Sequence, residues 1–143
     1  MRTFLLVIHI LAASAWFGHK LTIPRDIRTS LEHGPAAAAQ MVRRTSATAR
    51  LGIGSALLTV VSGVALLGQA DWRATTLRGL GILAAIGAIV MGATLARPAW
   101  AALEQAVERG ELAVAAAYGR RFARHLHTEN LLWLAALTAM VAG

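Results

Sequence analysis

Four long runs of apolar residues alternate with more polar segments along the chain. They cover residues 4–24, 51–68, 77–96 and 126–142. Each run approaches the ~20 residues that a helix needs to cross ~30 Å of hydrocarbon. A soluble domain does not place most of its residues in such runs. The pattern therefore predicts an all-α fold, a four-helix transmembrane bundle that forms one integral membrane domain over residues 1–143.

The first and third connections between these runs carry a helical pattern of their own. In the first, Ile27 and Leu31 lie at helical spacing, and Gly34 and Pro35 then interrupt the pattern before an alanine-rich stretch. Proline suits the first turn of a new helix. We expect the first helix to continue past the membrane, break at Gly34-Pro35 and restart. Residues 98–124 are interpreted in the same way, as short amphipathic cytoplasmic extensions. The second connection, residues 69–76, is a short turn that places Trp72 at the membrane interface.

Composition narrows the chemistry. Apolar residues make up 57% of the chain, and charged residues make up 15%, below the roughly 25% of soluble domains. The absence of cysteine excludes disulfides, thiolate metal sites, iron–sulfur clusters and covalently attached c-type haem. A metal site would therefore use histidine, carboxylate, methionine or backbone oxygen.

The basic residues behind the net charge of +7 are distributed unevenly along the chain, and their distribution indicates the membrane topology. Most basic residues flank or occupy the first and third connections: Lys20, Arg25, Arg28, Arg43, Arg44, Arg50, Arg97, Arg109, Arg120, Arg121 and Arg124. Because positive charge accumulates in cytoplasmic loops, we expect a multi-pass protein of a bacterial-type inner membrane with both termini outside. The basic excess favours contact with anionic membrane lipids and not with nucleic acid.

The histidines are the main candidates for chemistry. His9 lies in the outer part of the first span, whereas His19, His125 and His127 lie near the inner surface, and His33 lies beyond the membrane. An ionisable side chain inside a span is costly, so His9 needs a hydrogen-bond partner, a metal or a cofactor. At 100° per residue His9, Ala13, Trp16 and Lys20 share one stripe. His19 points elsewhere, and we expect it to face the histidines of the fourth span.

Small residues form stripes on the second and third spans. Gly52, Ser55, Thr59 and Gly63 share one face of the second, and Ala84, Ala88 and Gly92 share one face of the third. Such stripes allow close packing of membrane helices. They are also compatible with a flat cofactor between helices.

The first span resembles the opening of a known family. The pattern His9-Ile10-x-Ala12-x-x-x-Trp16, followed by Pro24-Arg25, is similar to that of HemJ-type protoporphyrinogen oxidases and of related four-helix membrane proteins, which include the copper-resistance CopD domain. In the HemJ-type family the matching histidine is associated with haem b. Two features of that family's third span, a lysine and a histidine, have no counterpart here. The resemblance therefore implies haem binding more than porphyrinogen oxidation, so that a role as a membrane oxidoreductase stays an open expectation.

Together these observations predict an integral membrane redox protein that binds one or two haem b groups. The candidate metal ligands are His9, His19, His125 and His127; the other candidate cofactor contacts are Trp16, Arg25, Arg78 and Arg124, the arginines as partners of the propionates. Copper handling, as in CopD, is one alternative, although Met1, Met41, Met91 and Met140 form no cluster. A non-catalytic membrane interaction protein is another. A redox partner or quinone and a homodimer are further expectations.

Overall fold

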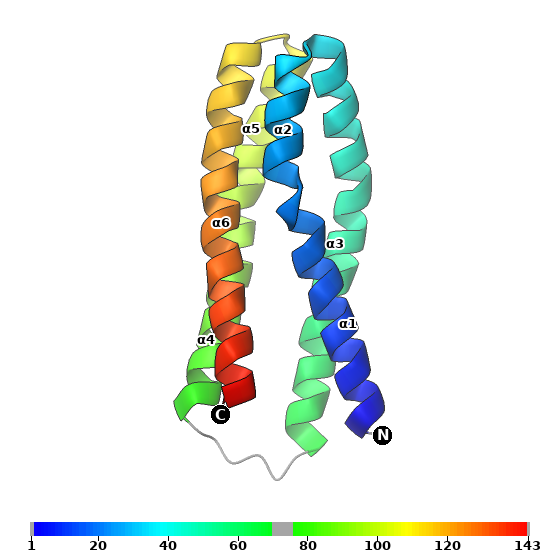
Figure 1. Ribbon diagram of the computed structural model, residues 1–143, viewed down its shortest axis with the longest axis vertical. Helices are drawn as coiled ribbons and strands as arrows, with labels where there is room; N and C mark the ends of the chain where they lie inside the picture. The colour runs from blue at the N-terminus through cyan, green and yellow to red at the C-terminus, as the bar shows by residue number, and fades with distance from the viewer. Residues whose placement is uncertain (1, 70–75, 143) are drawn as a thin grey trace.

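The computed structural model describes residues 2–69 and 76–142, and this part of the chain is helical without strands. The helices are α1 (Arg2–Leu21), α2 (Ile23–Glu32), α3 (Pro35–Gln69), α4 (Thr76–Met91), the π-helix η1 (Gly92–Ala96), α5 (Arg97–Glu108) and α6 (Leu112–Ala142). They form four rods: α1 followed by α2, α3 alone, α4 continuing through η1 into α5, and α6 alone (Figure 1). The all-α prediction is confirmed.

The breaks between rods have local causes in the sequence. Gly34 and Gly110 adopt positive φ angles of 96° and 73°, a conformation that glycine enters without steric cost, and each ends a rod at the same end of the molecule. The predicted break at Gly34-Pro35 is confirmed. Within the rods, α1 gives way to α2 two residues before Pro24, and η1 ends two residues before Pro98. Proline lacks the N–H that the helical ladder requires at these points.

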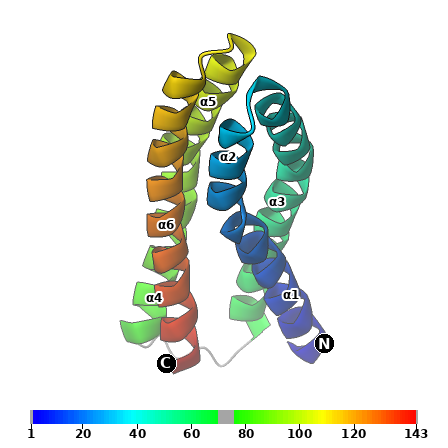
Figure 2. The same ribbon diagram turned by 45° about the horizontal axis from the view of Figure 1, so that its top comes forward.

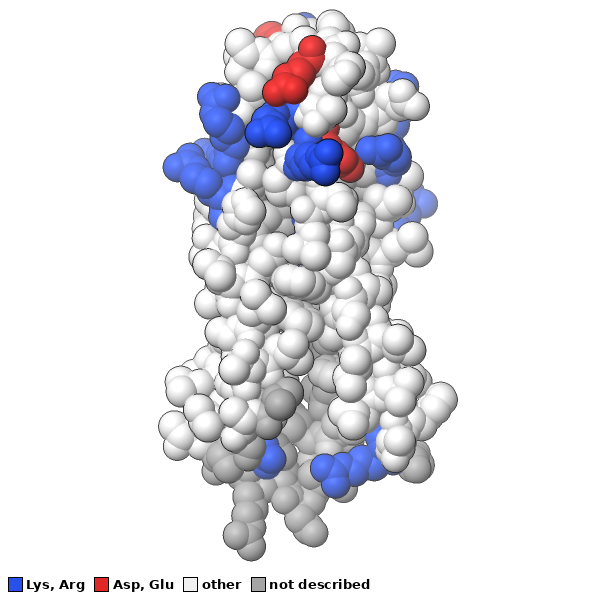
Figure 3. All heavy atoms as spheres, viewed as in Figure 1, with Lys and Arg blue, Asp and Glu red and all other residues white. Residues whose placement is uncertain are grey.

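Three of the rods are long and apolar enough to cross a membrane, namely Arg2–Glu32, Pro35–Gly68 and Thr76–Glu108. The fourth predicted span lies within α6, which is not among these three. On the face that Figure 3 shows, the middle of the molecule is almost free of charged side chains, and most of the visible Lys and Arg side chains lie near one end, with a few at the other. The turn predicted around Trp72 lies outside the described residues.

The best-packed core lies at the charged end of the molecule, where α2, α5 and the first parts of α3 and α6 meet. Leu103, Ala106, Ala38 and Ala115 are fully inaccessible there, and Met41 is 2% exposed. This end corresponds to the predicted cytoplasmic extensions. The sequence pattern predicted short extensions beyond the bundle, whereas in the structure these extensions are its most tightly packed part.

Away from this core the four rods separate into two pairs. Helix α1 packs along α3, and α4 packs along α6. Figures 1 and 2 show the two pairs diverging toward the end that carries both termini. Contacts of Phe17 with Trp133 and of Lys20 with Glu129 join α1 to α6 across the two pairs. The divergence opens a space between the pairs, and the candidate site lies there.

Candidate functional site

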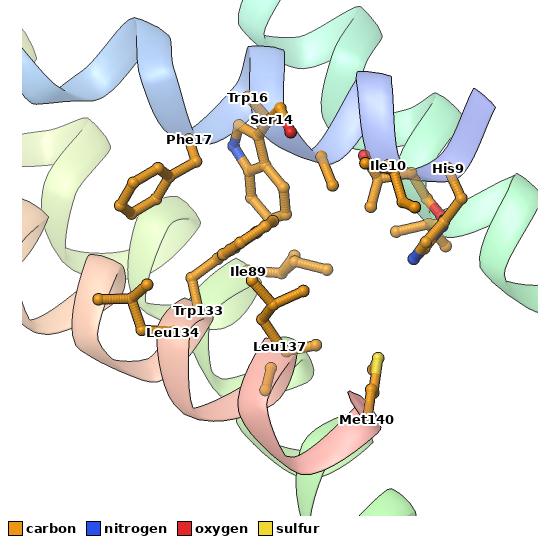
Figure 4. A pocket seen from close by; sticks show the side chains of 15 residues that line it. His9, Ile10, Ser14, Trp16, Phe17, Ile89, Trp133, Leu134, Leu137 and Met140 are labelled. Carbon is orange, nitrogen blue, oxygen red and sulfur yellow. The ribbon is translucent and has the colours of Figure 1, made fainter. Parts of the chain in front are cut away.

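A cavity of about 360 Å³ lies between the two helix pairs. Its walls come from all four rods, and they are almost entirely apolar (Figure 4). The lining residues are His9, Ile10, Ala13, Ser14, Trp16, Phe17, Thr59, Val60, Ala85, Ile89, Trp133, Leu134, Ala136, Leu137 and Met140. Cavities of this size, apolar and aromatic with few polar groups, are typical of small-molecule and cofactor sites.

The predicted stripe of α1 faces this cavity, because His9, Ala13 and Trp16 all line it. Trp16 is 7% exposed and Ala13 is 6% exposed, so the stripe lies on an inward face of the helix. The periodicity argument is therefore confirmed for these three residues. The fourth member, Lys20, lies one turn further along and places its ammonium 4.6 Å from the centroid of the Trp16 ring.

His9 is held against α3 by a hydrogen bond to the backbone. Its Nδ1 lies 2.9 Å from the carbonyl oxygen of Thr59 and 3.1 Å from Oγ of Ser62. A carbonyl only accepts, so Nδ1 carries the proton and donates it. The Ser62 hydroxyl donates to the Leu58 carbonyl at 2.6 Å, and its oxygen therefore accepts from His9. In the neutral imidazole this tautomer leaves Nε2 with a bare lone pair.

Gly63 makes room for this arrangement. A Cβ at that position would lie 3.1 Å from Cε1 of His9, tighter than ordinary contact. The predicted small-residue stripe of the second span thus leaves room for the imidazole ring of His9 against α3. Figure 4 shows His9 projecting from α1 with a ring nitrogen at the end that faces the open part of the cavity. The His9 side chain therefore presents a nitrogen donor to an apolar space.

Toward the charged end, a buried ion pair and an aromatic pair join α1 to α6. The Lys20 ammonium bonds Glu129, and only 17% and 4% of these two side chains are exposed. Glu129 lies against Gly92 of η1, where a Cβ would be 3.4 Å from its carboxylate oxygens. Beside this pair, the rings of Phe17 and Trp133 stack with centroids 5.2 Å apart. These contacts bound one end of the cavity.

The other predicted histidine ligands do not line the cavity. His19 packs against Gly52 of α3, where a Cβ would lie 3.2 Å from its Cδ2. We expected His19 to face the fourth span, so this direction was wrong; the small-residue stripe draws the ring to α3. His125 is half-buried, and its Nε2 is the one buried side-chain nitrogen or oxygen without a hydrogen-bond partner among the described residues. His127 is exposed.

The predicted arginines divide between the two ends of the molecule. Arg25 on α2 and Arg124 on α6 are exposed and do not line the cavity. Arg78 is half-buried in the first turn of α4. It lies one turn before Gly81, which packs against Ala136 and Met140 of α6. Of these three arginines, Arg78 is therefore the one that lies toward the end of the bundle where His9 and Met140 line the cavity.

The structure brings together several residues that sequence reasoning did not combine. The sequence pattern singles out neither Glu129 nor Trp133, and Met140 belongs to a set of methionines that form no cluster along the chain. For Glu129 the available signal was a carboxylate within an apolar run, because such a group requires a cationic partner. The roles of Trp133 and Met140 depend on which helices become neighbours.

Searches for related proteins gave no match: no family model, curated protein or solved structure is similar to this chain. Nor do three His, Cys, Asp or Glu side chains gather into a metal-binding group anywhere in residues 2–69 and 76–142. The assignment of a function therefore rests on the cavity and the residues around it.

Proposed function

We propose that this chain is a membrane redox protein that binds haem b in the cavity, where His9 would hold its iron. One observation carries the proposal. The Nδ1–H of His9 is committed to the Thr59 carbonyl, while the rest of the ring borders an apolar, aromatic cavity of about 360 Å³. Metal-ligating histidines typically donate their other ring N–H to a carbonyl or carboxylate, which fixes the tautomer and raises the basicity of the ligand.

The donor set around the cavity fits haem better than a bare metal ion. A copper or zinc ion is held by several protein ligands, whereas haem iron takes only one or two from the protein. No group of three His, Cys, Asp or Glu side chains is present among the described residues. One well-oriented histidine in a space suited to a flat ring is therefore compatible with haem and unfavourable for copper.

The surrounding residues have distinct roles in this proposal. Trp16 offers an aromatic face on which a macrocycle can stack. Phe17 and Trp133 close the cavity toward the charged end and keep water out. Arg78, at the opposite end, would pair with a propionate. Haem supplies one-electron chemistry when bound, and the apolar walls tune its potential by lowering the local dielectric.

Arg25 on α2 and Arg124 on α6 lie at the far end from Arg78. Arg124 immediately precedes His125, whose buried Nε2 has no partner in the described structure. A second haem near the inner surface would use this region. The cavity itself accounts for one haem. The ratio of haem to protein therefore distinguishes one bound group from two.

The membrane arrangement belongs to the same proposal. Leu131 of α6 is 65% exposed and does not line the cavity, as expected for a side chain that faces lipid. We therefore propose that α6 crosses the bilayer beside α4, completing a four-span bundle. The positive-inside rule then puts the charged core in the cytoplasm and both termini outside. Electrons would pass to or from a redox partner or a membrane quinone.

The test is the absorption spectrum of protein purified in detergent after expression with sufficient haem. We expect a Soret band, with α and β bands on reduction, and about one haem per chain. His9→Ala should abolish or shift this spectrum. His33→Ala is the matched control, because His33 Nδ1 also bonds a backbone carbonyl, that of Thr29 at 2.7 Å, but the ring is exposed at the end of α2.

Two results would overturn the proposal. One is a colourless wild-type protein, with or without stoichiometric copper by elemental analysis. The other is a haem spectrum that His9→Ala leaves unchanged. Copper in a colourless preparation would instead favour the CopD-like alternative.

A further inference from the structure

We infer that Met140 would hold the iron of the proposed haem together with His9, which would make the site a histidine–methionine centre. This inference rests on the proposed haem site. It assigns a residue of α6 as the ligand that faces His9 across the cavity. Met140 lines the same cavity as His9 but comes from the opposite helix pair. In Figure 4 its sulfur points up from α6 toward the part of the cavity into which the His9 ring projects.

Among the side chains that line the cavity, His9 and Met140 carry the donors that haem iron takes from proteins. The hydroxyls of Ser14 and Thr59 are hard oxygen donors, and the Thr59 hydroxyl already donates to the Ser55 carbonyl at 2.7 Å. Indole nitrogen is a hydrogen-bond donor only. The cavity therefore offers one nitrogen ligand from α1 and one thioether from α6.

Position along the helices excludes the other histidines as partners of His9. Two residues that would hold one iron atom must lie at the same depth of the bundle, because each would bond it directly. At a rise of ~1.5 Å per residue, His19 lies ~15 Å from His9 along α1. By the same rise, His125 lies ~22 Å from Met140 along α6. A site at the depth of His9 thus finds its second ligand near the end of α6.

Close packing between α4 and α6 holds Met140 in place. A Cβ on Gly81 would lie 3.2 Å from Cγ of Met140 and 3.1 Å from the carbonyl oxygen of Ala136. The absence of a side chain at Gly81 lets the base of the methionine rest on α4. Its flexible thioether end is left to turn into the cavity. Met140 is 38% exposed, so a ring entering between the pairs can reach it.

Iron-edge X-ray absorption and optical spectroscopy test the inference on the whole protein loaded with haem. We expect a sulfur ligand and a six-coordinate low-spin spectrum in the wild type. Met140→Leu should remove the sulfur signal and give five-coordinate high-spin haem with faster binding of carbon monoxide to the reduced form. Met140→His should restore the low-spin state at a lower midpoint potential, because methionine raises the potential of haem iron.

Met91→Leu is the matched control, since Met91 at the end of α4 does not line the cavity, and it should leave every signal unchanged. A haem protein whose spectra and potential do not change in Met140→Leu overturns this inference, and so does a wild type without iron–sulfur scattering. In both cases the proposed function survives, because the Soret band and its loss in His9→Ala are measured separately. A Met140→Leu variant that does not fold leaves the sulfur signal of the wild type as the deciding measurement.

Discussion

The buried pair of Lys20 and Glu129 should couple α1 to α6 with a free energy that a double-mutant cycle can measure. Breaking a buried ion pair by removing one partner typically costs about 3–5 kcal/mol, because the other charge stays buried and uncompensated. Replacing both partners by apolar residues of similar volume is often close to neutral. We therefore expect Lys20→Met combined with Glu129→Leu to unfold less easily than Lys20→Met alone.

The structure also predicts which single variant is worse. Lys20→Met leaves Glu129, whose side chain is only 4% exposed, without its cationic partner, so we expect the full ~3–5 kcal/mol. Glu129→Leu leaves Lys20, which lies 4.6 Å from the Trp16 centroid and keeps a cation–π contact of about 1–2 kcal/mol. Its long chain can also extend toward the interface. A cost of about 2–3 kcal/mol follows for Glu129→Leu.

The assay is reversible unfolding in mixed micelles of mild and denaturing detergent, with helicity as the signal. Arg28 and Glu32 on α2 are the control pair, since they are 77% and 64% exposed and 3.9 Å apart. An exposed pair at this spacing should couple by less than about 0.5 kcal/mol. If the losses in free energy of unfolding caused by Lys20→Met and Glu129→Leu simply add in the double variant, the two charges do not stabilise each other and the reasoning is refuted.

Two further outcomes follow from the structure. Gly63→Ala should push the His9 ring away from α3 and lower the haem-to-protein ratio, since the new Cβ would lie 3.1 Å from Cε1 of His9. Gly54→Ala is the control and should have no effect, because a Cβ there would have nothing within 4 Å. Equal ratios in the two variants would contradict the proposed position of the ring against Gly63. Because the native chain has no cysteine, Arg2→Cys and Arg109→Cys report topology directly. In intact cells an impermeant thiol reagent should label the first and not the second, and the opposite pattern would reverse the orientation.

Local features of the fold could be predicted from the sequence because their causes are local. The break at Gly34-Pro35 depends on two adjacent residues, and the stripe of His9, Ala13 and Trp16 depends only on the helical period. The direction of His19 could not be predicted. It depends on Gly52 of α3 lying beside it, and helical periodicity gives the angle between two side chains but not which helix lies at that angle.

The same limit explains the features that were missed. Pairing Lys20 with Glu129 requires α1 and α6 to be neighbours, although they lie at opposite ends of the chain. The placement of Met140 opposite His9 requires in addition that the two helix pairs diverge. Connection lengths do not specify either arrangement, because all four rods are long enough to accept several orders around a bundle.

If the four rods cross a bilayer as proposed, little opposes the divergence of the two pairs. Between helices in lipid there is little hydrophobic drive to close a gap, since lipid tails are as apolar as the side chains. The pairs are instead joined by the core around Leu103 and by the contacts of Lys20 and Phe17 with α6. His9 lies outside both of these regions, so His9→Ala should fold normally and affect only what the cavity binds. Conversely, a ring held by His9 and Met140 would join α1 to α6 in the open half, and loading it should raise the free energy of unfolding by mass action.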